Sequence, residues 1–172
     1  PPKYKIKLEL WYNKLNVFSN LFMYYFMVGI FLLILLIIEM FYKNKIIKHF
    51  IKFFIILVLL GFLVHITGLA SRWIISGHAP WSNGYESMIY IAFATLLSGV
   101  IFMKKSSLTL AATALVSSML LMVAHLNWLD PEITNLVPVL NSYWLMIHVS
   151  MITASYGFLA LGALLGFLSL WL

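Results

Sequence analysis

The side chains best suited to chemistry lie in and beside one polar, aromatic segment, residues 124–150 (AHLNWLDPEITNLVPVLNSYWLMIHVS). His148 comes about five residues inside the hydrophobic stretch that follows. A polar residue inside a membrane helix is costly without a partner, so it is a functional candidate by default. An imidazole at this depth could bind the iron of a large apolar cofactor such as haem. A histidine hydrogen-bonded to a neighbouring helix explains the same residue equally well.

The residues around His148 favour one face of a helix. Spacings of three and four place Trp144, His148, Met151 or Ile152, and Ser155 on the same side. This stripe of aromatic, imidazole and small side chains suits a flat apolar ligand. Trp144 is therefore a candidate haem contact, and no residue is assigned a catalytic role.

Composition defines the class of protein that must position these residues. The chain has 172 residues, of which 63% are hydrophobic and 9% are charged, and several runs approach the ~18–20 apolar residues that cross a bilayer. We therefore expect an all-α polytopic membrane protein. The absence of cysteine excludes disulfides, iron–sulfur clusters, Cys-ligated zinc and a CxxCH of its own for covalent haem. The net charge of +6 comes from lysine clusters beside the hydrophobic runs, which is typical of membrane proteins and does not indicate nucleic acid binding.

The hydrophobic runs predict about five transmembrane helices. Two short connections between them contain six lysines, which places these connections in the cytoplasm. The longer loops, 71–87 and 125–142, then lie outside as two ordered caps, because they combine aromatic residues with turn-forming prolines and glycines. Trp81 and Trp128 in these caps are further candidate haem contacts. The expected spans are residues 21–41, 50–69, 88–103, 108–124 and 143 to the end.

The leading residues follow a different pattern. In residues 3–10 (KYKIKLEL), lysine and glutamate alternate with apolar side chains, which predicts a short outer β-strand. A frayed lysine-rich leader is the other interpretation. A lone strand requires a sheet from elsewhere. The chain starts with Pro1 and ends within a span at Leu172, so we expect both ends to be cuts in a longer protein.

The remaining histidines favour structural roles. His65, near the outer end of the second span, is best explained by an interhelical hydrogen bond. His78 and His125 lie in or beside the outer loops, where histidines are usually solvated. Gly162 and Gly166 form a GxxxG motif, which we interpret as internal helix packing.

Three stretches carry a resemblance to a known family. Residues 72–93 (RWIISGHAPWSNGYESMIYIAF) and 124–167 resemble the CcsA family of System II cytochrome c biogenesis. Residues 11–22 (WYNKLNVFSNLF) are similar to the junction in CcsB–CcsA fusions, also called ResB/ResC-like proteins. The resemblance implies that residues 1–20 end a CcsB-like outer domain, and that residues 21–172 form part of a transmembrane haem-handling domain.

The family resemblance implies a function in haem presentation at the outer face of a bacterial inner membrane. Haem b would serve as substrate and ligand, held by two outer histidines beside a tryptophan-rich WWD segment. His148, in WLMIHVS, matches the first of them, whereas WWD is absent from this chain. The implied partners are apocytochrome c with its CxxCH motif, a CcsB-like part and the remaining CcsA part. Such a synthase, or haem lyase, would form thioethers, and this fragment alone would be inactive.

Two other functions remain open on the residues alone. A transporter fragment predicts charged or broken helices at the membrane midplane, and almost no charge lies at the centres of these spans. A scaffold subunit predicts no coloured cofactor after purification. An absorption spectrum of the full-length protein in detergent separates the haem function from both alternatives.

Overall fold

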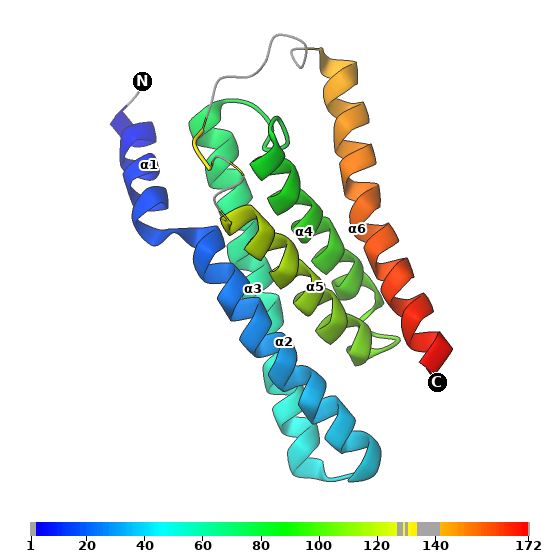
Figure 1. Ribbon diagram of the computed structural model, residues 1–172. Helices are drawn as coiled ribbons and strands as arrows, with labels where there is room; N and C mark the ends of the chain where they lie inside the picture. The colour runs from blue at the N-terminus through cyan, green and yellow to red at the C-terminus, as the bar shows by residue number, and fades with distance from the viewer. Residues whose placement is uncertain (1–2, 127–128, 130, 134–141, 172) are drawn as a thin grey trace.

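The computed structural model shows a helical bundle (Figure 1). It describes residues 3–126, 129, 131–133 and 142–171. Five of its helical stretches are long and apolar enough to cross a membrane, as predicted, and the chain is a multi-pass membrane protein. The stretch Tyr4–Phe41 joins most of the first helix to the second. The helices are α1 (Lys3–Leu15), α2 (Val17–Phe41), α3 (Lys45–Ser76), α4 (Gly84–Phe102), α5 (Ser107–His125) and α6 (Tyr143–Trp171).

The predicted N-terminal strand is wrong. Residues 3–10 belong to α1, and the described part of the chain contains no strand. A helix satisfies its own backbone hydrogen bonds, whereas a lone strand cannot. Lysine, leucine and glutamate are also good helix formers, so eight alternating residues are weak evidence for a strand. Asn16, with a positive φ of 46°, separates α1 from α2.

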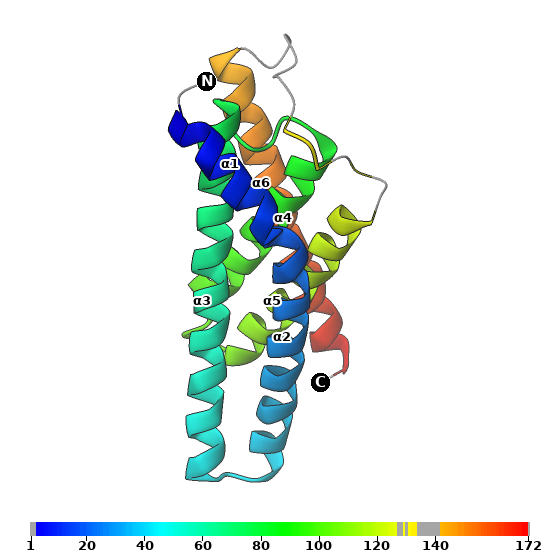
Figure 2. The same ribbon diagram turned by 90° about the vertical axis from the view of Figure 1, so that its left-hand side faces the viewer.

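Helices α2 to α5 form the body of the bundle, and α1 and α6 lie at its periphery. Helix α5 packs against α2 and α4, helix α2 also packs against α3, and α6 lies mainly against α4 (Figures 1 and 2). Tyr25, Val58 and Ile89, from three different helices, are fully buried at the centre. Large apolar side chains such as Phe53 and Leu63 are exposed, as expected for surfaces that face lipid.

The two ends of the bundle differ. One end, here called the loop end, carries α1, the connection 77–83 and the described residues between α5 and α6, which are 126, 129, 131–133 and 142. The opposite lysine end carries the short turns 42–44 and 103–106. At 32 residues, α3 is about 48 Å long and exceeds the ~30 Å apolar thickness of a bilayer. The α2–α3 turn therefore projects beyond the α4–α5 turn at the lysine end (Figure 2).

Small residues allow the helices to approach closely. A Cβ atom at Gly99 would collide with Thr113 of α5, and one at Gly157 would lie 2.5 Å from the backbone nitrogen of Thr95 in α4. Our interpretation of the GxxxG motif is wrong, because Cβ atoms at Gly162 and Gly166 would meet nothing within 4 Å in the described structure. The packing glycine of α6 is Gly157.

Candidate functional site

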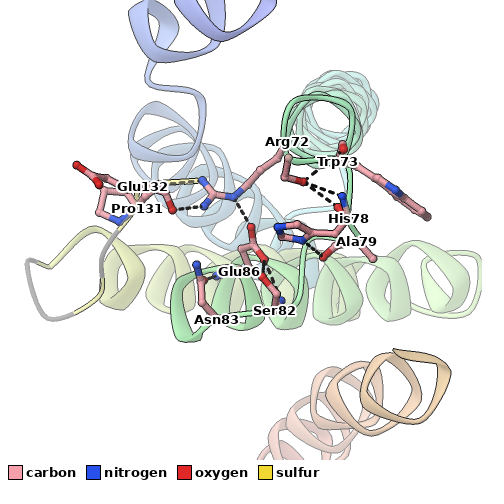
Figure 3. Close-up of polar contacts among 10 residues, drawn as sticks. Arg72, Trp73, His78, Ala79, Ser82, Asn83, Glu86, Pro131 and Glu132 are labelled. Carbon is pink, nitrogen blue, oxygen red and sulfur yellow. Dashed lines mark hydrogen bonds and ion pairs between the residues drawn. The ribbon is translucent and has the colours of Figure 1, made fainter. Parts of the chain in front are cut away.

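A buried ion pair joins α3 to α4 at the loop end. Arg72 Nε donates to Glu86 Oε1 at 3.0 Å, and neither side chain is accessible to solvent (Figure 3). Arg72 is in the last turns of α3, and Glu86 is in the first turn of α4. Buried charges are tolerated when they are paired and their remaining hydrogen-bonding groups are satisfied.

The loop between α3 and α4 satisfies the second carboxylate oxygen. The backbone nitrogen and hydroxyl of Ser82 donate to Glu86 Oε2 at 2.9 and 2.6 Å. The Asn83 side chain caps α4 by accepting from the Glu86 backbone nitrogen at 2.8 Å. Gly77, with a positive φ of 78°, ends α3 in the left-handed conformation that glycine adopts most readily. The first predicted cap is therefore ordered by its own hydrogen bonds.

The same arginine holds the connection from α5 to α6. Arg72 Nη1 donates to the carbonyl of Pro131 at 2.8 Å, and Nη2 donates to that of Glu132 at 3.1 Å (Figure 3). The Tyr85 ring lies 4.9 Å from the guanidinium carbon, in a cation–π arrangement. One side chain therefore ties three segments together, using the planar fork of donors that lysine lacks.

A cavity of about 420 Å³ opens beside this ion pair. Its wall combines residues of α1 and the α1–α2 junction with Arg72, Tyr85 and the connection at 131–133. Tyr12 from α1 lines it and is mostly buried. Polar and apolar groups both contribute to the wall, and Arg72 is already engaged with its partners.

The histidines of the bundle have different surroundings. His65 is fully buried, with Nε2 3.0 Å from the Ile89 carbonyl and Nδ1 3.4 Å from the Tyr25 hydroxyl, so its predicted interhelical hydrogen bonding is confirmed. His78 is only 7% exposed, with Nδ1 3.1 Å from the Ala79 carbonyl. The expectation of a solvated His78 is wrong, because the loop folds over it. His125 is exposed, 2.9 Å from the Ser19 hydroxyl.

Trp81 belongs to an aromatic cluster on the α3–α4 side. Its ring lies 5.9 Å from that of Trp73 and 5.0 Å from that of Tyr90. Its indole nitrogen is buried without a hydrogen-bond partner in the described structure. Trp128 lies outside the described residues, so its predicted role in the second cap stays a prediction.

His148 and Trp144 lie on the exposed side of α6. Trp144 is 78% exposed, His148 is exposed, and Met151 is 70% exposed. The buried side of α6 contains Thr153 and Gly157, which face α4. The predicted stripe therefore exists as one outward face, and it does not join the polar cluster around Arg72.

This face fits one side of a haem ligand set. His148 supplies an imidazole among apolar and aromatic neighbours, which is the donor type that haem iron accepts. The described residues contain no group of three or more His, Cys, Asp or Glu that could hold another kind of metal centre. The described α6 thus offers one exposed imidazole.

The sequence contained a signal for the Arg72–Glu86 pair that we did not use. Arg72 is the only arginine in the chain and follows the second hydrophobic span closely, and Glu86 comes just before the third. A charge at the end of each of two consecutive spans, on the same side of the membrane, predicts pairing between neighbouring helices.

Comparison with known proteins identifies the family. The model of the "Cytochrome C assembly protein" family matches residues 81–172, more than half of the chain. Protein NrfI of Wolinella succinogenes is 42% identical over 167 residues, which cover 96% of this chain and 18% of NrfI. The cytochrome c biogenesis proteins CcsA of Prochlorococcus marinus subsp. pastoris and Lobularia maritima are 40% and 43% identical. These two matches cover 56% and 58% of this chain and 32% of each relative.

The chain thus spans less than a fifth of NrfI and about a third of these CcsA relatives. The family match includes α4, α5 and α6, and with them both Glu86 and His148. The resemblance to CcsA that the sequence motifs indicated is confirmed. The chain belongs to the cytochrome c assembly protein family.

Proposed function

We propose that this chain is the haem-presenting part of a cytochrome c synthase, and that His148 is an axial ligand to the iron. The observation that carries the proposal is an imidazole on the outward, apolar face of α6 in a member of a cytochrome c assembly family. Exposing a histidine to lipid costs free energy unless the side chain has a partner or a ligand. Trp144 and Met151 supply apolar surface on either side of it.

The reaction to be served is attachment of haem to the CxxCH motif of an apocytochrome c. Haem b supplies the vinyl groups that accept the cysteine thiols. His148 would hold and orient the iron, and Trp144 would cover part of the macrocycle. Trp81 and Trp128 remain candidates for further contacts. The chain would contribute position and protection, since the reactive groups belong to the haem and the apocytochrome.

We infer that the loop end faces the outside of a bacterial inner membrane. The lysine-rich turns at the opposite end would then lie in the cytoplasm, following the positive-inside rule. A second axial ligand, the WWD segment and a CcsB-like part would come from other parts of the assembly. The helices from α2 to α6 continue without a break at mid-membrane, and this continuity gives no support to a solute pathway.

The test is haem retention by the full-length protein purified in detergent. We expect His148→Ala to remove most of the Soret absorbance per protein and to stop cytochrome c maturation. His49→Ala is the matched control, because His49 is an exposed histidine at the lysine end and should not affect either readout. In a His148→Gly variant, added imidazole should restore part of the absorbance. Unchanged Soret absorbance and maturation in His148→Ala would refute the proposal.

A further inference from the structure

The body of the bundle is stepped at the lysine end. Helices α4 and α5 have 19 residues each and are about 28 Å long, whereas α3 has 32 residues. The α2–α3 turn extends past the α4–α5 turn, and the start of α5 lies beside the last turns of α2 (Figure 2). A cavity of about 440 Å³ opens at this step, between the end of α2, the first turn of α3 and the first turn of α5.

The wall of this cavity carries a net positive charge. Lys43 of the α2–α3 turn and Lys48 of the first turn of α3 both line it, and both are exposed. Neither ammonium group makes an ion pair in the described structure. Glu39 also lines the cavity, so two lysines against one glutamate give the wall a formal charge of +1.

The turn that carries Lys43 is ordered by its own hydrogen bonds. The backbone nitrogen of Tyr42 donates to the carbonyl of Ile38 at 2.8 Å. The side chain of Asn44 caps α3 by accepting from the backbone nitrogen of Ile46 at 3.0 Å. The backbone therefore presents Lys43 beside the cavity in a defined place.

The first turn of α5 adds hydrogen-bond donors to the same wall. Ser106, Ser107 and Leu108 line the cavity, and the Ser106 side chain makes no capping hydrogen bond. The backbone nitrogens of Ser107 and Leu108 donate to no backbone oxygen in the described structure. The positive end of the α5 dipole is therefore open toward the two lysines, and together they favour an anion.

The rest of the wall is apolar. Leu36, Ile37 and Met40 of α2 line the cavity, with Leu108 of α5 beside them, and Met40 is 69% exposed. A small hydrophilic anion has no use for these side chains. In a membrane protein, cationic and hydrogen-bonding groups next to exposed apolar side chains match the headgroup and first acyl carbons of a phospholipid.

We propose that this cavity binds one phospholipid with a single negative charge, such as phosphatidylglycerol, from the leaflet at the lysine end. Lys43 and Lys48 pair with the phosphate, and the first turn of α5 donates hydrogen bonds to it. The charge of +1 on the wall matches that of one phosphodiester. The bound lipid bridges the α2–α3 and α4–α5 hairpins at the step. This role depends neither on haem binding nor on which side of the membrane the lysine end faces.

Lipid titration of the full-length protein in detergent, followed by native mass spectrometry, tests the proposal. We expect Lys43→Gln/Lys48→Gln to bind phosphatidylglycerol about 20-fold more weakly, since each lysine near a headgroup contributes about fivefold. Lys45→Gln/Lys52→Gln is the matched control. It removes the same charge from the same end, but neither lysine lines the cavity, so affinity should change by less than about twofold. Equal losses in the two double variants would overturn the proposal.

Other ligands identify what the site recognises. Phosphatidylcholine, which has no net charge, should bind at least about fivefold more weakly than phosphatidylglycerol. Millimolar inorganic phosphate should not displace the lipid, because phosphate makes no apolar contacts. Equal affinity for the two lipids, or displacement by phosphate, would overturn the proposal.

A variant at Glu39 keeps the proposal testable if the lysine variant does not fold. Glu39→Gln leaves both lysines in place and removes the carboxylate that repels the phosphate. We expect it to bind phosphatidylglycerol about fivefold more tightly and phosphatidylcholine with native affinity. Unchanged or weaker binding of phosphatidylglycerol by Glu39→Gln would show that the phosphate does not occupy this cavity.

Discussion

Two regions at the loop end differ in whether their polar side chains have partners within the described chain. Around Arg72 and Glu86 every described hydrogen-bonding group is satisfied inside the chain. On α6, His148 lies on an exposed apolar face, with Trp144 and Met151 beside it. The first region is closed and the second is open.

The contrast separates stability from function. A polar cluster whose groups are all paired contributes to the stability of the fold, because each polar group offsets the free-energy cost of burying its partner. An open imidazole on a lipid-facing helix adds nothing to the described packing. The haem ligation proposed above would give this imidazole a role outside that packing. Substitutions in the two regions should show different phenotypes.

The largest effect is expected from breaking the closed region. Glu86→Ala would leave the Arg72 guanidinium buried without its counter-charge, at a cost of about 3–5 kcal/mol. We expect strongly reduced folded protein and a lower midpoint of thermal unfolding in detergent. In contrast, His148→Ala should unfold at the native temperature. Equal losses of stability in the two variants would remove the distinction between the regions.

The packing surface of α6 gives the next largest effect. Gly157→Ala places a methyl group against the Thr95 backbone and should cost about 1–3 kcal/mol through overpacking. Gly162→Ala is the matched control, because its methyl group would enter open space. Thermal unfolding of both variants measures the difference. A destabilised Gly162→Ala variant would mean that this glycine also packs against another helix.

His65 tests whether a closed histidine differs from an open one. His65→Ala would leave the Ile89 carbonyl without its bond and the Tyr25 hydroxyl without its partner, which should cost about 1–3 kcal/mol. Haem retention per folded protein should stay native, opposite to the expectation for His148→Ala. Loss of haem in a stable His65→Ala variant would show that His65 also serves the ligand.

The sequence predicted the open region better than the closed one. Hydrophobic runs and lysine clusters depend on composition alone, so the five spans could be located directly. The face shared by Trp144 and His148 followed from helical spacing, which is local. The Arg72–Glu86 pair could have been inferred from charges at the ends of consecutive spans, but no local pattern reports the bonds from Arg72 to Pro131 and Glu132, which are 59 and 60 positions away.

Residues 3–10 show how a short local pattern misleads. Alternation over eight residues is compatible with a strand, but tertiary context decides when propensities are weak. The helix that contains residues 3–10 continues to Tyr12, contacts α3 and buries the Tyr12 side chain near Arg72. The prediction that the GxxxG motif packs against another helix was wrong for a related reason. Spacing shows that two glycines share a face of the helix, but it does not show whether a neighbouring helix lies against that face.

The smallest effect concerns the loop that supports the closed region. Asn83→Ala removes the cap of α4 and should cost about 1 kcal/mol. Asn83→Asp keeps an accepting oxygen but adds a second negative charge near Glu86, so it should be less stable than Asn83→Ser, which caps without charge. Thermal unfolding in detergent gives the order. If Asn83→Asp were the most stable of the three, the charge balance of the cluster would have to include a further cation, because Arg72 alone neutralises only Glu86.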